Sequence, residues 1–253
     1  MSASTEIAPD AAGLRVARVE LAAALRAAAL YGFNEGIDNH FSLAVPGRSD
    51  CFLLNPYGPH WSELRASDLL TIGLGGERIA GEGRLDTTAF TIHLGAHRAR
   101  PDAACVLHTH MPYATALAVT EEGFDTRASQ NAARFHGGRY VYHRDYGGLF
   151  SSPDECLPIA EQIAAGVRVV LLRNHGVLVA HRDLPWMVLT AVTLERAVML
   201  QSIAATLGTA KPIEVGLVHD LQRRKYNDGL VDEYWQAWVR DMRRRGRADG
   251  MES

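Results

Sequence analysis

The chain has 253 residues, of which 47% are hydrophobic and 22% are charged, and its formal net charge at pH 7 is −3. This is the composition of an ordinary globular protein that is long enough to bury one sizeable core. A charge so close to neutral argues against broad electrostatic binding to nucleic acid. The three cysteines have no CxxC spacing, which argues against a disulfide framework and favours a reducing compartment.

We expect neither a secretory signal nor a membrane helix. The first residues, MSASTEIAPDAAG, lack a basic segment followed by an apolar one, and no apolar run approaches the ~20 residues of a membrane helix. These features predict a cytoplasmic protein with a flexible tail over residues 1–12. Residues 13–253 are then expected to form a single domain that ends in a helical tail.

The expected elements alternate between helices and short strands, which predicts one mixed α/β domain. The first helix runs from about Leu14 to Tyr31 and stops at Gly32. Strands are expected in the segments HFSLAV, CFLLNP, DLLTIG, ACVLHTH, GRYVYH and VRVVLLRN. Further helices are expected from Thr87 or Thr88 to about Arg98, in PYATALAVT, over Asp154–Ala165, in PWMVLTAVTLERAVMLQSIAATLG, and as one amphipathic helix over HDLQRRKYNDGLVDEYWQAWVRDMRRRGRADG.

Two histidines lie two residues apart in VLHTHMPY, at the end of an apolar strand. Residues at this spacing share one face of a strand, so His108 and His110 can chelate a divalent metal together. A third histidine, His175, follows the apolar run LLRN, where we expect the chain to leave the sheet. The HxH pattern alone also fits two strand-end histidines without a metal. Three protein ligands would leave open positions, which is typical of a catalytic metal site.

The segments ARPDAACVLHTHMPYATA and LLRNHGVLV resemble the class II aldolase/adducin family, as do EGIDNHFSL and LLNPYGPHWSELRASDL upstream in the same order. The resemblance covers roughly residues 14–210. It implies a three-layer α/β/α fold with a central mixed, largely antiparallel sheet, and a homotetramer with active sites at subunit interfaces. It also implies one divalent metal ion per subunit (Zn, Mn, Fe or Co), held by His108, His110 and His175.

The sequence departs from the sugar-phosphate aldolases of this family at the carboxylate that they carry early on the helix before the HxH strand. That position falls on Ala89, which can neither ligate a metal nor accept a proton. His93 lies one helical turn further on the same face and is a candidate catalytic residue or a packed histidine. Asp86 is expected to cap the helix. Glu35, in NEGIDNH, is a second catalytic candidate.

The elements that bind the substrate phosphate in the family aldolases are partly altered. The Thr-Gly turn is replaced by NPYG, so a phenol ring occupies the place of a small hydroxyl residue and favours a flat or carboxylated substrate. The subunit-bridging aldolase tyrosine falls near Gln130 and Asn131, and Tyr146 downstream is the catalytic candidate in its place. The expected substrate-binding residues are Asn39, Ser42, Tyr57, Gly58, Thr87 and Thr88.

These departures favour a divalent-metal-dependent carbon–carbon lyase that decarboxylates a hydroxylated aromatic or other carboxylated small molecule. The alternatives are an aldolase on an atypical hydroxy-carbonyl substrate, an Fe/Mn-dependent oxygenase and a non-catalytic adducin-like assembly protein. The expected partners are a small-molecule substrate and further copies of the chain, with neither nucleic acid nor membrane. The terminal RRRGR is interpreted as a solvated basic helix end.

Overall fold

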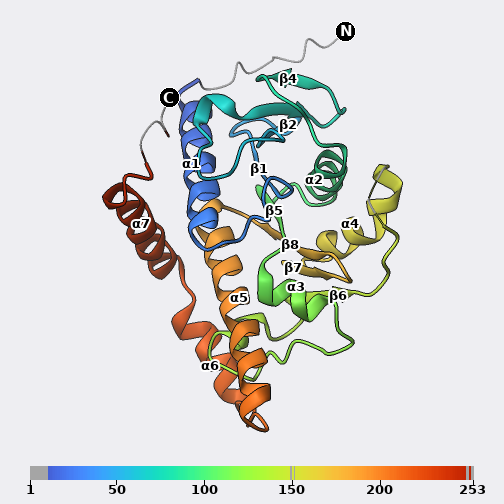
Figure 1. Cartoon of the computed structure of the whole chain (residues 1–253), viewed down its shortest axis with the longest axis vertical. Helices are drawn as coiled ribbons and strands as arrows, with labels where there is room; N and C mark the ends of the chain where they lie inside the picture. The colour runs from blue at the N-terminus through green and yellow to red at the C-terminus, as the bar shows by residue number, and fades with distance from the viewer. Residues whose placement is uncertain (1–10, 149, 151, 249–250, 252–253) are drawn as a thin grey trace.

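Eight strands form the sheet at the centre of the molecule: β1 (His40–Ala44), β2 (Cys51–Leu54), β3 (Leu70–Gly73), β4 (Arg78–Ala80), β5 (Cys105–Thr109), β6 (Tyr140–His143), β7 (Val169–Leu172) and β8 (Gly176–His181). They lie in the order β4-β3-β2-β1-β5-β8-β7-β6 (Figure 1). The computed structural model describes residues 11–148, 150, 152–248 and 251. Among these residues β6 and β7 pair in parallel, and the other neighbouring strands are antiparallel.

Helices cover both faces of the sheet. They are α1 (Ala11–Leu30), α2 (Thr87–Ala99), α3 (Pro112–Ala118), α4 (Leu157–Ala164), α5 (Leu184–Leu207), α6 (Val215–Lys225) and α7 (Asp228–Arg244). Helices α1, α3 and α5 pack on one face and α2 and α4 on the other, while α7 lies outside α1 and α5 (Figure 1). The predicted α/β fold, with three layers and a mixed, largely antiparallel sheet, is confirmed.

The alternation of side chains along β5 explains why the sheet needs helices on both faces. Leu107 is buried in the cluster beneath α1 and α5, and its neighbour Val106 is buried in the cluster beneath α2 and α4. Successive strand residues point to opposite faces, so a strand that is apolar at every position must be covered twice. His108 lies on the same face as Val106, and the strand therefore directs its ring toward the α2 layer.

Two strands, β4 and β8, were not predicted from the sequence. The chain was expected to leave the sheet at Gly176, but it turns back at once and forms β8, which lies between β5 and β7. The segment GVLVAH is buried throughout, and a tight turn rather than a long loop connects it to β7. The edge strand β4 is exposed at all three positions, so it has no hydrophobic pattern by which to be recognised.

The two ends of the chain also differ from the prediction. Residues 1–10 of the expected tail lie outside the described residues, and Ala11 and Ala12 already belong to α1. The prediction of a single C-terminal helix is wrong, because the chain is extended at Tyr226 and two helices, α6 and α7, form instead. Asn227 caps the second helix, since its side-chain oxygen accepts a hydrogen bond from the backbone N–H of Leu230 at 3.1 Å.

Helix α5 has the predicted length but contains the long apolar run that the sequence was not expected to have. It has 24 residues with a mean hydropathy of 1.3 over its most apolar window, which meets the length and composition of a membrane span. Half of that window is buried against the rest of the protein, where α5 packs on α1, α3 and β8. Packing on the sheet therefore accounts for the buried half of this window, and the end of α5 remains exposed and apolar.

Candidate metal centre

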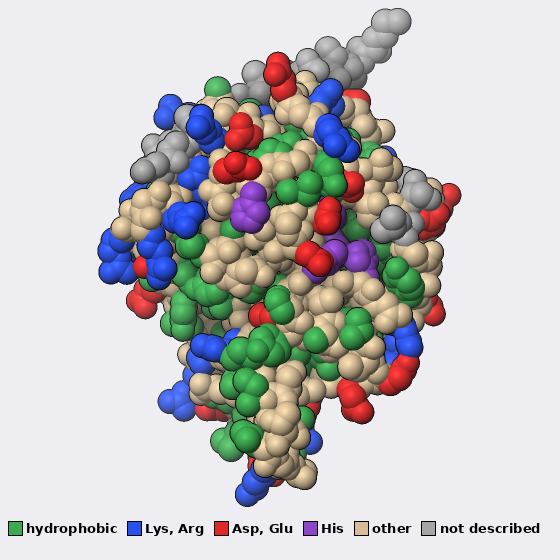
Figure 2. All heavy atoms as spheres, viewed as in Figure 1, with side chains coloured by type: hydrophobic (Ala, Val, Ile, Leu, Met, Phe, Trp, Pro, Cys, Tyr) green, Lys and Arg blue, Asp and Glu red, His purple; other side chains and the backbone are tan. Residues whose placement is uncertain are grey.

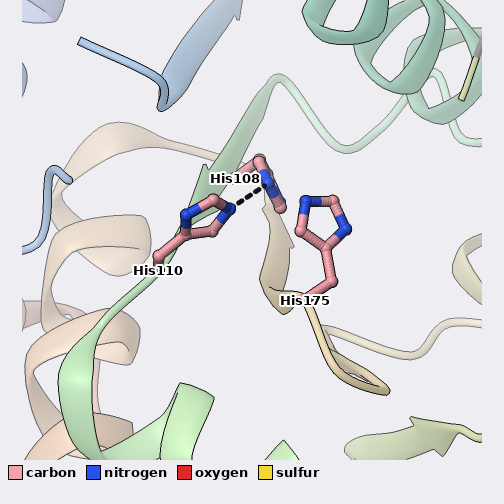
Figure 3. Close-up of side chains that lie close together, drawn as sticks. All are labelled: His108, His110 and His175. Carbon is pink, nitrogen blue, oxygen red and sulfur yellow. Dashed lines mark hydrogen bonds between the residues drawn. The ribbon is translucent and has the colours of Figure 1, made fainter. Parts of the chain in front are cut away.

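The turn between β7 and β8 carries His175. The backbone N–H of His175 donates to the carbonyl oxygen of Leu172 at 3.1 Å, which closes a four-residue turn. Within it Asn174 has a φ of 53°, a left-handed conformation that asparagine tolerates better than most residues. Because β8 lies next to β5, this turn places His175 beside the end of β5, where His108 and His110 lie (Figure 3).

These three residues, the histidine triad, present one ring nitrogen each to a common point (Figure 3). The three nitrogens lie within 4.8 Å of one another, and Nε2 of His108 is 3.2 Å from Nε2 of His110. Two nitrogens bound to one tetrahedral ion lie about 3.4 Å apart. The spacing therefore fits a shared metal ion. Histidine side chains reach the surface on this face of the molecule, next to acidic side chains (Figure 2).

Hydrogen bonds on the far side of two rings hold them in this orientation. Nδ1–H of His108 donates to the carbonyl oxygen of Val177 at 3.1 Å, and Nδ1 of His110 lies 2.6 Å from Oε2 of Glu35. Both partners accept, so Nδ1 carries the proton and Nε2 is left as the ligand atom. The side-chain oxygen of Asn39 in turn accepts from the backbone N–H of Glu35 at 2.5 Å.

Gly176 allows the two strand ends to approach this closely. A Cβ added there would lie 2.7 Å from Cδ2 of His110 and 2.7 Å from the carbonyl oxygen of Thr109. Neither neighbour is the end of a flexible chain, since one is a ring held by Glu35 and the other is backbone. Any side chain at this position would displace the His110 ring from the triad.

Burial favours the neutral form of His108 and His175, which is the form that binds metal ions. Burial, with a smaller effect of the neighbouring imidazoles, lowers the pKa of His108 well below its usual value. Burial and then His110 lower the pKa of His175 to about 4. Imidazole nitrogens suit zinc, iron and other divalent first-row metals. The partly exposed His110 and His175 leave the ion's position open to a substrate.

A second group of imidazoles, the imidazole row, is buried behind the triad. Nδ1 of His40 shares a 3.0 Å hydrogen bond with Nε2 of His93, whose Nδ1 lies 2.5 Å from Oγ of Ser42. The same hydroxyl lies 2.8 Å from Nε2 of His97. The row meets the triad where His40 stacks on His108, with ring centroids 4.9 Å apart. Burial lowers the pKa of all three imidazoles of the row, that of His97 to about 4.

The imidazole row changes the interpretation of two predicted site residues. His93 has no exposed surface and both of its ring nitrogens are hydrogen-bonded, and its hydrogen bond to His40 links it to the triad. Ser42 is also fully buried between His93 and His97, rather than at a surface where a phosphate could reach it.

Helix α2 brings no carboxylate to the triad among the described residues. Ala89 is 3% exposed, and its backbone N–H donates to Oδ1 of Asp86 at 2.7 Å. Asp86 therefore caps α2, as the sequence predicted. In the first turn Thr87 is exposed, and Oγ1 of Thr88 donates to the carbonyl oxygen of Phe150 at 3.2 Å.

Tyr57 lies on the rim of the site, linked to the triad through the segment that carries Glu35. Its hydroxyl donates to Asp38 at 3.4 Å, and the guanidinium of Arg84 lies 4.8 Å from the centre of its ring. Gly58 follows it with a φ of 121°, in the left-handed region. Tyr146 is 54% exposed and makes no contact with the triad among the described residues, so its role stays a prediction.

Comparison with known proteins identifies the family. Residues 19–202 match the model of the Class II Aldolase and Adducin N-terminal domain. The chain belongs to the class II aldolase/adducin family. A solved aldolase II superfamily protein from Pseudomonas syringae has the same fold, with a TM-score of 0.82 at 29% identity over 93% of this chain and 95% of the other.

Three relatives show how varied this family is. An adducin-related protein of Schizosaccharomyces pombe is 35% identical over 64% of this chain, which spans about half (51%) of that protein's length. The decarboxylase NovR of Streptomyces niveus is 31% identical over 77% of this chain and 71% of its own. A 4-hydroxy-3-prenylphenylpyruvate oxygenase/4-hydroxy-3-prenylbenzoate synthase of Streptomyces roseochromogenus subsp. oscitans is 31% identical over 76% and 69%.

Sequence reasoning missed the partners of the predicted residues. It did not pair Glu35 with His110, and it did not recognise the imidazole row or Arg84. One signal was present, because His93 and His97 are four residues apart and share a face of the predicted helix. The contact of His40 with that face depends on the pairing of β1 with β5, which the sequence does not reveal.

Proposed function

We propose that this chain is a divalent-metal-dependent carbon–carbon lyase that decarboxylates a hydroxylated aromatic or other carboxylated small molecule. The observation that carries the proposal is the open histidine triad beside a helix that offers Ala89 in place of the aldolase carboxylate. Loss of CO₂ leaves an electron pair on carbon and requires a proton to be added, whereas the aldolase carboxylate serves to handle a proton of the substrate. A helix without that carboxylate is compatible with decarboxylation.

The residues of the site have separate roles in this proposal. His108, His110 and His175 hold the metal ion, and Glu35 fixes the orientation of the His110 ring. When bound, the ion polarises a substrate oxygen and stabilises negative charge that develops on the adjacent carbon. His93 then acts on position only, through His40 and the stacked ring of His108.

The rim of the site favours a flat, negatively charged substrate. The ring of Tyr57 offers a stacking face, and the guanidinium of Arg84 lies over that ring. Among the described residues no carboxylate pairs with Arg84, so its charge is available to a substrate carboxylate. Tyr57 also contacts Asp38, in the segment that carries Glu35.

A second candidate function is oxidative removal of carbon by an iron enzyme. It is supported by the relative that is named as an oxygenase as well as a synthase, and by the affinity of imidazole for Fe(II). The aldolase and the non-catalytic assembly protein receive less support. A scaffold has no need of three converging ligand atoms, and the altered helix α2 argues against sugar-phosphate aldol chemistry.

The deciding experiment measures metal content and CO₂ release together. The purified protein is analysed for metals, reconstituted with Zn, Mn, Fe(II) or Co, and supplied with a panel of hydroxylated aromatic acids under nitrogen and in air. We expect one equivalent of metal per chain and CO₂ release under nitrogen. Release that requires O₂ would instead support the oxygenase, and protein that binds no divalent ion would overturn both functions.

We also propose that the chain assembles as a homotetramer. Apolar side chains are exposed toward the far ends of α5 and α6, and apolar surface gathers over this end of the molecule (Figure 2). They include Leu200, Ile203, Leu207 and Leu217. Light scattering is expected to give four times the chain mass of 27.7 kDa, and a monomeric mass would contradict the proposal.

A further inference from the structure

Apart from the metal centre, the molecule has a cavity of about 320 Å³ at the opposite end of the central strands. Arg139 precedes β6, Arg168 precedes β7 and His181 ends β8. These three residues therefore lie at the same end of three neighbouring strands. The backbone brings them together, because the N–H of Arg168 donates to the carbonyl oxygen of Arg139 at 3.1 Å. The two ends of β8 lie about 17 Å apart at the rise of an extended strand. This cavity is therefore separate from the triad of the same chain.

Arg134 is a buried cation in the wall of this cavity. Its side chain is 4% exposed, and its guanidinium lies 4.9 Å from the ring centre of Trp186 and 5.0 Å from that of Tyr226. Nη2 donates to Oγ1 of Thr190 at 2.6 Å. The buried Nη1 has no hydrogen-bond partner among the described residues. A buried donor of a charged group without an acceptor is costly unless a ligand completes it.

His181 adds a second unpaired donor. It is 3% exposed and stacks on Trp186, with ring centroids 5.3 Å apart. Its Nδ1 accepts the backbone N–H of Arg182 at 2.9 Å, so Nε2 carries the proton. In the described part of the chain this buried Nε2–H has no acceptor either.

The charges around the cavity are strongly unbalanced. Arg134, Arg139, Arg168 and Arg182 line it, and Asp228 is its one carboxylate among the described residues. That carboxylate is engaged already, because it forms an ion pair with Arg182 and accepts from the indole N–H of Trp186 at 2.7 Å. The other three guanidiniums have no ion pair with a carboxylate of the described chain.

We propose that this cavity binds the phosphoryl group of a small molecule. A phosphoryl group carries up to two negative charges on three acceptor oxygens, and the planar fork of arginine matches it with paired hydrogen bonds. A single carboxylate has two oxygens and one charge, which is too little for three guanidiniums without an ion pair and the buried Nε2–H of His181. The rings of Trp186 and Tyr226, each in contact with the guanidinium, hold Arg134 in place before the ligand arrives. This proposal does not depend on the reaction at the triad.

The test is calorimetric titration of the whole protein with inorganic pyrophosphate, with inorganic phosphate and citrate as comparison anions at equal ionic strength. We expect pyrophosphate to bind more tightly than citrate, and Arg168→Gln to weaken that binding at least tenfold. The matched control is Arg196→Gln, an exposed arginine on α5 outside the cavity, which should bind within twofold of the unmodified chain. If Arg168→Gln does not fold, Arg139→Gln serves the same purpose.

Pyrophosphate can also chelate a metal ion at the triad, so only binding that Arg168→Gln removes counts as binding to this cavity. Equal affinity in Arg168→Gln and Arg196→Gln would overturn the proposal, as would the absence of any binding to the unmodified chain. Citrate that binds tenfold more tightly than pyrophosphate would also overturn it, because the ligand class would then be a polycarboxylate.

Discussion

The histidine triad and the imidazole row are built from the same residue type and touch at His40 and His108, yet their nitrogens are used differently. In the triad, hydrogen bonds to a carbonyl and a carboxylate occupy Nδ1 of two rings and leave Nε2 atoms to converge. In the row, the imidazoles and Ser42 are bonded to one another, and all three rings are buried. The hydrogen-bond acceptors around a cluster, rather than the number of histidines, therefore distinguish a ligand set from a packed core.

Removing a triad ring should have the largest effect. His108→Ala deletes one ligand and leaves an opening beside His40, so we expect divalent metal affinity to fall at least ~100-fold and activity to disappear. His97→Asn removes a ring of the row and should keep the metal within about threefold. Cobalt titration followed by its visible absorption measures both. An equal loss of metal affinity in the two variants would contradict the proposed difference between the triad and the row.

Gly176→Ala should be nearly as damaging although it removes no ligand. The added Cβ would lie 2.7 Å from both the His110 ring and the Thr109 carbonyl, so the ring must move out of the triad. We expect a loss of metal affinity on the order of 30-fold. The control is Gly95→Ala on α2, where the added Cβ meets its nearest atom, Cβ of Cys156, at 3.6 Å and should be tolerated. Unchanged affinity in Gly176→Ala would show that the triad does not need this close approach.

Glu35→Gln tests the acceptor that distinguishes the triad from the row. The amide oxygen can still accept from His110, but the negative charge that raises the basicity of the ring is lost. We expect roughly tenfold weaker metal binding. Glu82→Gln, an exposed glutamate away from the triad, should change nothing. If both variants bind metal equally, the 2.6 Å contact of Glu35 with His110 is incidental.

The sequence was sufficient for the triad but not for its surroundings. His108 and His110 are two residues apart on one strand, and the family motif includes His175, so local spacing and resemblance were enough. The row depends on the register that sets His40 opposite His108, and Glu35 reaches His110 from 75 residues away. Such contacts depend on which strands pair. The sequence did not predict that β1 pairs with β5, because neither strand alone specifies its neighbour in the sheet.

His93→Ala tests whether the row acts on the triad at all. It removes the partner of His40 without touching a ligand, so we expect reduced turnover with partial retention of metal. His93→Gln, which can still bond to His40, should recover part of the turnover. A role in packing alone would instead lower stability in both variants and leave kcat and metal affinity unchanged. Unfolding in urea and steady-state kinetics separate these outcomes.

The last expected effect is on stability rather than on metal binding, and it is a pH dependence that comes from the row. Burial lowers the pKa of His97 to about 4, below its usual 6.5, so the unfolded chain binds more protons between these values. The free energy of unfolding therefore rises with pH across this window, levels off above 6.5, and is lost on acidification, by on the order of 3 kcal/mol for one such group. His97→Asn should reduce the slope of the dependence measured by urea unfolding between pH 7.5 and 5 by the share of one group, while the other buried imidazoles keep theirs. His219→Asn, an exposed control, should retain it, and parallel curves for all three proteins would assign the acid sensitivity to other groups.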